Sequence, residues 1–271
     1  MRYKKHITYI LITGLLCVTA FPASASLVIR PKPVDNHQHN RRAEKIFTLT
    51  GQENSTVTML TPDLQQSQLK INNGEIKFKP TGKDNYHVII AKRFFNNVQQ
   101  TAIRYVYSFG KPTGKSPSEL TGFKKSALEI IPAPLPREHW HYKAGHQATF
   151  DIHFKGKPVA DTKVSLSTSH ASLLQAKTSS QGRVVFDIPD DFAQTHAGDR
   201  ANQPGDFLVH VKHTEKKQQY ATWLSADYQV DPAHWRNTQL GVLVAAFGFT
   251  VGLIITGSGS RKIIKKNGDN K

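Results

Sequence analysis

Two apolar stretches, one near each end of the 271-residue chain, limit where this protein can fold. The first runs from Ile7 to Phe21 after a basic start and is followed by Ala23-Ser24-Ala25. A basic segment, an apolar core and a small-residue A-x-A site are the three parts of a secretory signal peptide. We therefore predict a cleaved signal over residues 1–25 and a mature chain that begins near Ser26.

The second apolar stretch runs from Leu240 to Thr256, and uncharged residues continue through Ser260. It is long enough to cross about 30 Å of hydrocarbon. The cations that follow, from Arg261 to Lys266, are of the kind that stays in the cytoplasm. We predict a transmembrane helix over 238–260, a basic cytoplasmic tail over 261–271, and a periplasmic ectodomain held at the inner membrane by this single pass.

Charge and cysteine content limit the kinds of partner and metal ligand that the ectodomain can have. Cys17 is the only cysteine and lies in the predicted signal, so the mature chain has neither a disulfide nor a thiolate metal ligand. Between signal and tail the chain carries 28 Lys and Arg against 19 Asp and Glu, a net charge of +9. Such a surface attracts anionic lipid headgroups, envelope polymers or acidic proteins, or it only keeps the protein soluble. The compartment excludes nucleic acid.

The pattern of the ectodomain is that of β-strands. Apolar residues alternate with polar ones in short runs, as in Thr149 to Phe154, and no helical period of comparable length is present. We predict an all-β fold with two β-sandwich-like domains, the second an Ig- or prealbumin-like Greek key. The predicted parts are a flexible arm over 26–44, a first β-domain over 45–109, a linker over 110–126 and a second β-domain over 127–230.

Several motifs in the second half resemble a known family. They are Leu128 to Pro132, Lys143-Ala144-Gly145, the turn F-K-G-K-P-V-A-D-T-K-V from Phe154, and T-S-S-Q-G-R-V-V-F-D-I-P from Thr178. Together they resemble the bacterial periplasmic family labelled a nickel/cobalt-uptake substrate-specific region, whose second domain is similar to the prealbumin or carboxypeptidase-regulatory β-sandwich. The resemblance spans Phe47 to Tyr228. It implies a role beside a transition-metal transporter. Many relatives begin with a histidine-containing segment, whereas Ser26 to Val34 has no histidine.

Histidines supply the candidate metal site. The two His-x-His pairs are His37/His39 and His139/His141, with His146 close to the second pair. Residues i and i+2 of an extended segment share a face, so both rings of a pair can approach one ion. Imidazole ligands without sulfur suit Ni, Co, Cu or Zn, and Asp35 and Glu138 can add an oxygen. The alternative is that the first pair lies in a polar arm and the second in a loop where Trp140 and Tyr142 pack and the histidines face water.

The predicted membrane helix carries a stripe of small residues. Gly248, Gly252 and Thr256 follow one another at intervals of four, which lets a second helix approach closely. This spacing predicts either a homodimer, docking on a partner helix, or passive anchoring without a partner. The chain shows no nucleophile elbow, phosphate-binding glycine loop, zincin helix or closely spaced carboxylate pair, so we predict that it is not an enzyme.

These observations lead to two functional hypotheses. The first is a membrane-anchored accessory protein of a nickel- or cobalt-type transport system, which binds metal or a metal permease through its β ectodomain. The second is an Ig-like interaction module without a metal role, which binds another envelope protein or polymer through its basic surface.

Overall fold

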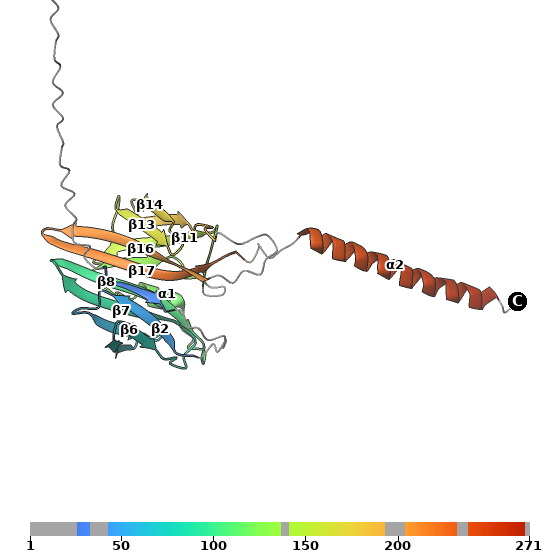
Figure 1. The fold of residues 1–271 in the computed structure, drawn as a ribbon, viewed down its shortest axis with the longest axis horizontal. Coiled ribbons are helices and arrows are strands. Elements are labelled where there is room, and N and C mark those ends of the chain that lie inside the picture. The colour runs from blue at the N-terminus through green and yellow to red at the C-terminus, as the bar shows by residue number, and fades with distance from the viewer. Residues whose placement is uncertain (1–25, 33–42, 137–140, 193–203, 232–237, 269–271) are drawn as a thin grey trace, which may run out of the picture.

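The computed structural model describes residues 26–32, 43–136, 141–192, 204–231 and 238–268, and the predicted signal 1–25 lies outside them. The described residues between 26 and 231 form a β-body, and helix α2 (Thr238–Gly268) follows it in the chain (Figure 1). The strands are β1 (Val28–Pro31), β2 (Lys45–Thr50), β3 (Thr56–Leu60), β4 (Gln66–Leu69), β5 (Ile71–Asn72), β6 (Glu75–Phe78), β7 (Asn85–Phe95), β8 (Val98–Ser108), β9 (Leu128–Pro132), β10 (Tyr142–Lys143), β11 (Gln147–Phe154), β12 (Lys157–Pro158), β13 (Lys163–Thr168), β14 (Leu173–Lys177), β15 (Arg183–Asp187), β16 (Pro204–Glu215) and β17 (Gln218–Gln229). A short helix, α1 (Pro117–Gly122), lies between β8 and β9.

The strands form three sheets. The central sheet has the order β14-β13-β16-β17-β8-β7-β3-β4, and β10 pairs with β17. A second sheet, β1-β2-β6-β5, packs on one face of β3, β7, β8 and β17 of the central sheet. A third sheet, in which β11 pairs with β9, β12 and β15, packs on the opposite face of the central sheet. The predicted all-β fold with an apolar C-terminal helix is confirmed.

The long central strands are buried on both faces. In β7, Val88 and Ile90 point into the core shared with the third sheet, whereas Ile89 and Ala91 point into the core shared with the second. A strand covered on both sides needs a continuous apolar run rather than alternation. This requirement explains why the sequence from Tyr86 to Ala91 is apolar at nearly every position.

A parallel pairing joins the two halves of the chain. β17 runs beside β8 from Gln219↔Val98 to Ser225↔Arg104, so one sheet passes through both predicted β-domains. At this junction Arg104 is 2% exposed; its Nη2 lies 2.5 Å from Asp227 Oδ1 and its Nη1 donates to Ser225 Oγ at 3.2 Å. Burial opposes ionisation of Asp227, but the Arg104 charge and hydrogen bond keep its pKa below the usual value. The predicted domain boundaries stay a prediction.

Two segments differ from the sequence-based expectation. The predicted flexible arm over 26–44 begins with strand β1, which pairs with β2, and Leu27 and Ile29 are almost completely buried. An apolar run of three residues is too short to stand out as a strand in the sequence, but it completes the second sheet. Residues 33–42 of this arm lie outside the described residues.

The predicted linker over 110–126 contains α1. Ser116 caps this helix, since Ser118 N–H donates to Ser116 Oγ at 3.3 Å and Ser116 N–H donates to Glu119 Oε1 at 3.3 Å. Such a reciprocal capping box stabilises a helix start. Leu120 then points into the core and fixes α1 against the body.

Helix α2 contains one apolar segment, Gln239–Gly257, with a mean hydropathy of 2.2 and none of it buried. By length and composition it can cross a membrane. The helix continues to Gly268, beyond the predicted end at residue 260 and into the predicted tail. Arg, Lys and Ile in this part tolerate helical geometry, which explains why the helix does not stop at the first cation.

Candidate functional site

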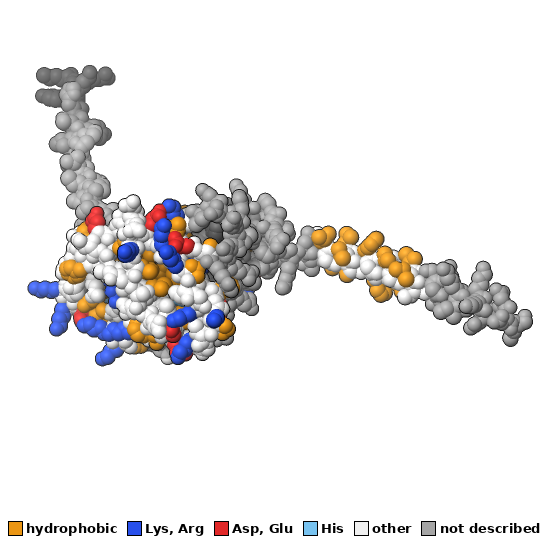
Figure 2. Space-filling model, turned by 90° about the horizontal axis from the view of Figure 1, so that it is seen from below, with side chains coloured by type: hydrophobic (Ala, Val, Ile, Leu, Met, Phe, Trp, Pro, Cys, Tyr) orange, Lys and Arg blue, Asp and Glu red, His pale blue; other side chains and the backbone are white. Residues whose placement is uncertain are grey.

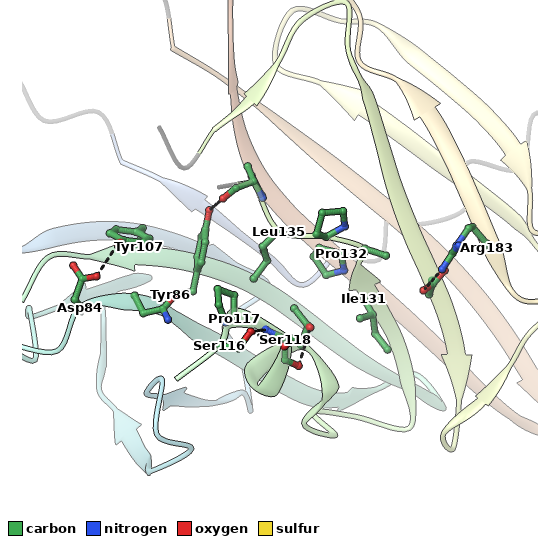
Figure 3. Close-up of a pocket in the computed structure, with 16 residues that line it drawn as sticks. Asp84, Tyr86, Tyr107, Ser116, Pro117, Ser118, Ile131, Pro132, Leu135 and Arg183 are labelled. Atoms are coloured by element: carbon green, nitrogen blue, oxygen red, sulfur yellow. Dashed lines mark hydrogen bonds and ion pairs between the residues drawn. The ribbon is translucent and has the colours of Figure 1, made fainter. Parts of the chain in front are cut away.

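A cleft of about 670 Å³ lies between α1, the start of β7 and the segment that follows β9 (Figure 3). It is lined by Asp84, Asn85, Tyr86, Tyr107, Ser116, Pro117, Ser118, Thr121, Ile131, Pro132, Ala133, Pro134, Leu135, Pro136, Asp151 and Arg183. The strand register shows at which end of the body the cleft lies. β7 begins opposite the end of β8, and β8 runs parallel to β17. The cleft therefore lies near the end of β17, from which the chain continues to α2.

A buried lysine holds α1 at the edge of the cleft. Lys125 Nζ is fully buried and donates to the carbonyl oxygens of Leu120 (3.2 Å), Thr121 (2.9 Å) and Phe123, the last turn of the helix and its cap. These carbonyls have no partner inside the helix, so the ammonium group satisfies them. Burial lowers the pKa of Lys125 to about 8. Lys125 and the buried Leu120 together hold α1 in place.

Most polar groups of the cleft are engaged within the protein. The Tyr107 hydroxyl donates to Asp84 Oδ2 at 2.9 Å, and the Tyr86 hydroxyl donates to the Pro136 carbonyl at 2.6 Å (Figure 3). At the far side, Arg183 forms two hydrogen bonds with Asp151, at 2.8 and 3.1 Å. Burial raises the pKa of Tyr86 well above its usual value, so its phenol is neutral. The groups that fix the wall are thus ordered before any ligand arrives.

The lining favours binding over catalysis. Tyrosine rings and prolines give an apolar surface with a few placed polar groups, as in ligand sites. The two serines hydrogen-bond to each other, with Ser116 Oγ 2.7 Å from Ser118 Oγ. None of the lining residues that the structure describes is a histidine or a cysteine, the usual partners of an activated nucleophile.

A second hollow of about 360 Å³ shares the segment from Ala133 to Pro136 with the cleft. His141 and His146 both line it, and His146 Nε2 lies 2.6 Å from Asp231 Oδ2. His37, His39 and His139 lie outside the described residues. Among the residues that are described, no three His, Cys, Asp or Glu side chains gather in a way that could hold a metal ion. The metal site stays a prediction.

A small chamber shares lining residues with both hollows. It has a volume of about 20 Å³ and is bordered by Tyr86, Leu135 and Pro136, which also line the cleft. The hydroxyls of Tyr105 and Tyr142 are buried here, and neither has a hydrogen-bond partner within the described part of the chain. Burial raises the pKa of both phenols far above the usual value, so both are neutral.

Two further histidines, one buried and one partly buried, lie on the central sheet and belong to neither predicted pair. His87 is fully buried between Asn85 O (3.1 Å from Nδ1) and Thr81 Oγ1 (2.7 Å from Nε2), so its Nδ1 carries the proton and its Nε2 accepts. His210 stacks on Trp223 with ring centroids 4.7 Å apart. Burial lowers the pKa of each to about 4. His87 is buried because β7 is covered on both faces, which a lone histidine in the sequence does not reveal.

The predicted packing stripe lies on α2. Gly248 and Gly252 have open space where a side chain would begin, and Thr256 Oγ1 donates to the Gly252 carbonyl at 2.9 Å. No element of the described body covers this segment. Its role in helix association stays a prediction.

Comparisons with known proteins assign no family. No protein-family model and no curated protein matches the chain. Among solved structures, a bacterial ice-binding adhesin is 14% identical and matches over 76% of this chain and 64% of its own, with a TM-score of 0.28. The D0-D1 domain of intimin is 13% identical, over 69% and 90%, with a TM-score of 0.25. A two-domain fibronectin type III segment of chicken tenascin is 9% identical, over 75% and 98%, with a TM-score of 0.24. Scores this low identify neither a relative nor a ligand.

Proposed function

We propose that this protein is a membrane-anchored interaction module whose β-body stands in the periplasm and binds another envelope component in the cleft beside α1. The observation that carries the proposal is the Gln239–Gly257 segment, which is apolar and wholly unburied. Leaving so much apolar surface in water is unfavourable, whereas a bilayer covers it. The basic residues after it favour a cytoplasmic C-terminus and a periplasmic body.

The position of the cleft favours a partner in the same membrane. β17 ends at Gln229, a few residues before α2 begins at Thr238. The cleft residues Asp84 and Asn85 lie at this same end of the sheet, next to the end of β8. A periplasmic loop of a neighbouring membrane protein can therefore enter the cleft without leaving the bilayer surface.

A role beside a metal transporter is the second candidate. One observation favours it: His141 and His146 line the same hollow, and His146 contacts a carboxylate. Neutral imidazoles with one oxygen suit nickel, cobalt, copper or zinc. His139 precedes His141 by two residues in the sequence and lies outside the described residues. This version of the function keeps the anchored body and adds the metal as cargo.

The anchor is tested by fractionation. The full-length protein should remain in membranes washed with alkaline carbonate, and its β-body should be digested by protease added to the periplasmic side. A variant that ends at residue 237 should become soluble. Full-length protein released by carbonate, or a body protected from periplasmic protease, would refute the anchored arrangement.

The cleft is tested by site-specific photo-crosslinking in membranes. A crosslinking amino acid at Ser118, an exposed residue of the cleft wall, should give a discrete adduct with another membrane protein. The same amino acid at Lys157, exposed on β12 and outside the cleft, is the control. Equal adducts from both positions, or none from Ser118, would show that the cleft is not the contact.

The metal role is tested by calorimetry of the full-length protein with Ni²⁺, Co²⁺, Cu²⁺ and Zn²⁺. We expect one of these ions to bind and the double substitution His139→Ala and His141→Ala to abolish binding. His153→Ala, on strand β11 and outside the hollow, is the control. Binding that survives the double substitution, or no binding by the native protein, would contradict a metal role at this hollow.

A further inference from the structure

We propose that the end of the body farthest from α2 is a second docking surface, and that it binds an anionic glycan polymer of the envelope. This surface, which we call the tip, consists of the two hairpin turns Phe94–Val98 and Glu215–Gln218 together with Lys212. The proposal rests on the proposed periplasmic location of the body, but it does not depend on the proposal for the cleft. In Figure 1 the β7–β8 and β16–β17 hairpins both end at the side opposite α2.

Strand length separates the tip from the anchor. β17 begins at Gln218 in the tip and ends at Gln229, where the chain leaves for α2. Twelve residues of strand span about 40 Å at roughly 3.3 Å per residue. Electrostatic attraction is screened over about 8–10 Å at physiological salt. With β17 upright on the membrane that holds α2, the lipid headgroups are therefore out of reach of the tip.

The two turns are held side by side. Asn97 Nδ2 donates to the Lys217 carbonyl at 3.2 Å, and Gln218 Nε2 donates to the Asn97 carbonyl at 3.1 Å. The parallel pairing of β8 and β17 begins directly beside them, at Gln219↔Val98. The tip is thus a preorganised surface, which lowers the entropic cost of binding.

The tip is strongly basic. Lys212, Lys216 and Lys217 are exposed, and none of them has an acidic partner within 4.0 Å among the described residues. Glu215, the acid of the turns, is already paired with Lys155 at 2.5 Å. Figure 2 shows Lys and Arg side chains that project from the end of the body opposite α2. The electrostatic complement of this surface is a chain of negative charges.

The type of cation points to a polymer rather than to a folded protein. The unpaired cations of the tip are all lysines, whereas Arg93 nearby is buried and donates to Gly51 O and Gln100 Oε1. Protein interfaces are enriched in arginine and depleted in lysine. Lysine is a mobile point charge, which suits irregularly spaced carboxylates or phosphates. Phe94 is 61% exposed and offers an apolar face to the C–H side of a sugar ring.

The proposal is tested with full-length protein in detergent and polygalacturonate as the anionic glycan. We expect binding to polygalacturonate that weakens as salt is added, and no binding to neutral dextran. The pair Lys216→Gln and Lys217→Gln should weaken binding about tenfold, since each exposed ion pair contributes modestly. The matched pair Lys79→Gln and Lys111→Gln, which removes the same charge from exposed positions elsewhere, should have little effect.

Three further outcomes decide the identity of the ligand. Phe94→Ser should weaken glycan binding without changing its salt dependence, because the ring acts through stacking. Equal losses from the two lysine pairs would overturn the proposal in favour of general charge attraction. Tighter binding to poly-glutamate or to vesicles rich in phosphatidylglycerol than to the glycan would assign the tip to an acidic protein or a bilayer instead. None of these results depends on the Ser118 crosslink, so the two proposals can fail separately.

Discussion

Four buried or partly buried tyrosines, three of them at the cleft or the chamber, test how hydrogen bonds contribute to the stability of the body. The hydroxyls of Tyr86 and Tyr228 donate to Pro136 O and Asp191 Oδ1, both at 2.6 Å. Those of Tyr105 and Tyr142 are buried without a partner in the described protein. Replacing each tyrosine with phenylalanine removes one oxygen and keeps the ring, so the four variants differ only in the hydrogen bond that is lost.

The expected change in the free energy of unfolding for each variant follows from the hydrogen-bond partner of the tyrosine hydroxyl that is removed. Tyr86→Phe loses a neutral hydrogen bond and should cost about 1 kcal/mol, while Tyr228→Phe loses a bond to a carboxylate and should cost about 1.5–3 kcal/mol. Tyr105→Phe and Tyr142→Phe lose no bond to the protein and remove a buried polar group, so stability should stay equal or rise by about 1 kcal/mol. One kcal/mol corresponds to about 2–4 °C in Tm for a chain of this size.

The assay is thermal unfolding of full-length protein in detergent, followed by tryptophan fluorescence and repeated with guanidinium. The predicted order of Tm places Tyr105→Phe and Tyr142→Phe at or above the native protein, then Tyr86→Phe, then Tyr228→Phe. A loss for Tyr105→Phe or Tyr142→Phe as large as that for Tyr86→Phe would refute the reasoning, because it would mean that solvent satisfies those hydroxyls as well as the protein satisfies Tyr86.

Three further predictions concern pH, backbone packing and the helix. His87 and His210 have pKa values of about 4 in the folded protein against 6.5 for an unperturbed histidine, so between these values the unfolded chain binds more protons. The free energy of unfolding should therefore be highest above pH 6.5 and fall by about 3 kcal/mol for each histidine as the pH drops from 6.5 to 4. Chemical denaturation at several pH values would show this fall. Substituting both histidines should flatten this slope, and an unchanged slope would contradict the assignment. Gly110→Ala would place Cβ 2.1 Å from the carbonyl oxygen of Gly82 and should lower the free energy of unfolding by at least about 2 kcal/mol. Gly122→Ala meets open space and should leave the stability unchanged. Equal Tm values for the two variants would disprove the clash. Gly252→Leu should weaken self-association of the full-length protein in membranes, measured by crosslinking, and an unchanged dimer fraction would leave passive anchoring.

The strands of the body could largely be predicted from the sequence, since each leaves a local pattern. Phe150, Ile152 and Phe154 alternate along β11 because one face of that strand meets the core. The parallel pairing of β8 with β17 could not be predicted in the same way. The paired residues, such as Val98 and Gln219, are far apart in the chain. The continuous apolar sequence of a strand that is buried on both faces does not indicate which strand pairs with it.

The cleft was missed for a different reason. Its wall uses α1, whose capping-box residues Ser116 and Glu119 were present in the sequence. The surrounding Gly, Pro, Ser and Lys indicated a linker, and composition outweighed the local helix signal. The chamber depends on Tyr105 and Tyr142, which come from strands in different halves of the chain and meet only in the folded protein. Of the two predicted histidine pairs, only His141 and the nearby His146 are described, and both line the neighbouring hollow; His37, His39 and His139 lie outside the described part of the chain.

The placement of β17 has a mechanical consequence. This strand connects the membrane anchor to the tip, and it is bonded along one edge to β16 and along the other to β8. A pulling load between a bound polymer and the bilayer would act along the strand, at right angles to its antiparallel hydrogen bonds with β16. Both ends of that load lie on one strand, so the covalent backbone of β17 would carry it, and the hydrogen bonds to β16 and β8 would keep the strand in register.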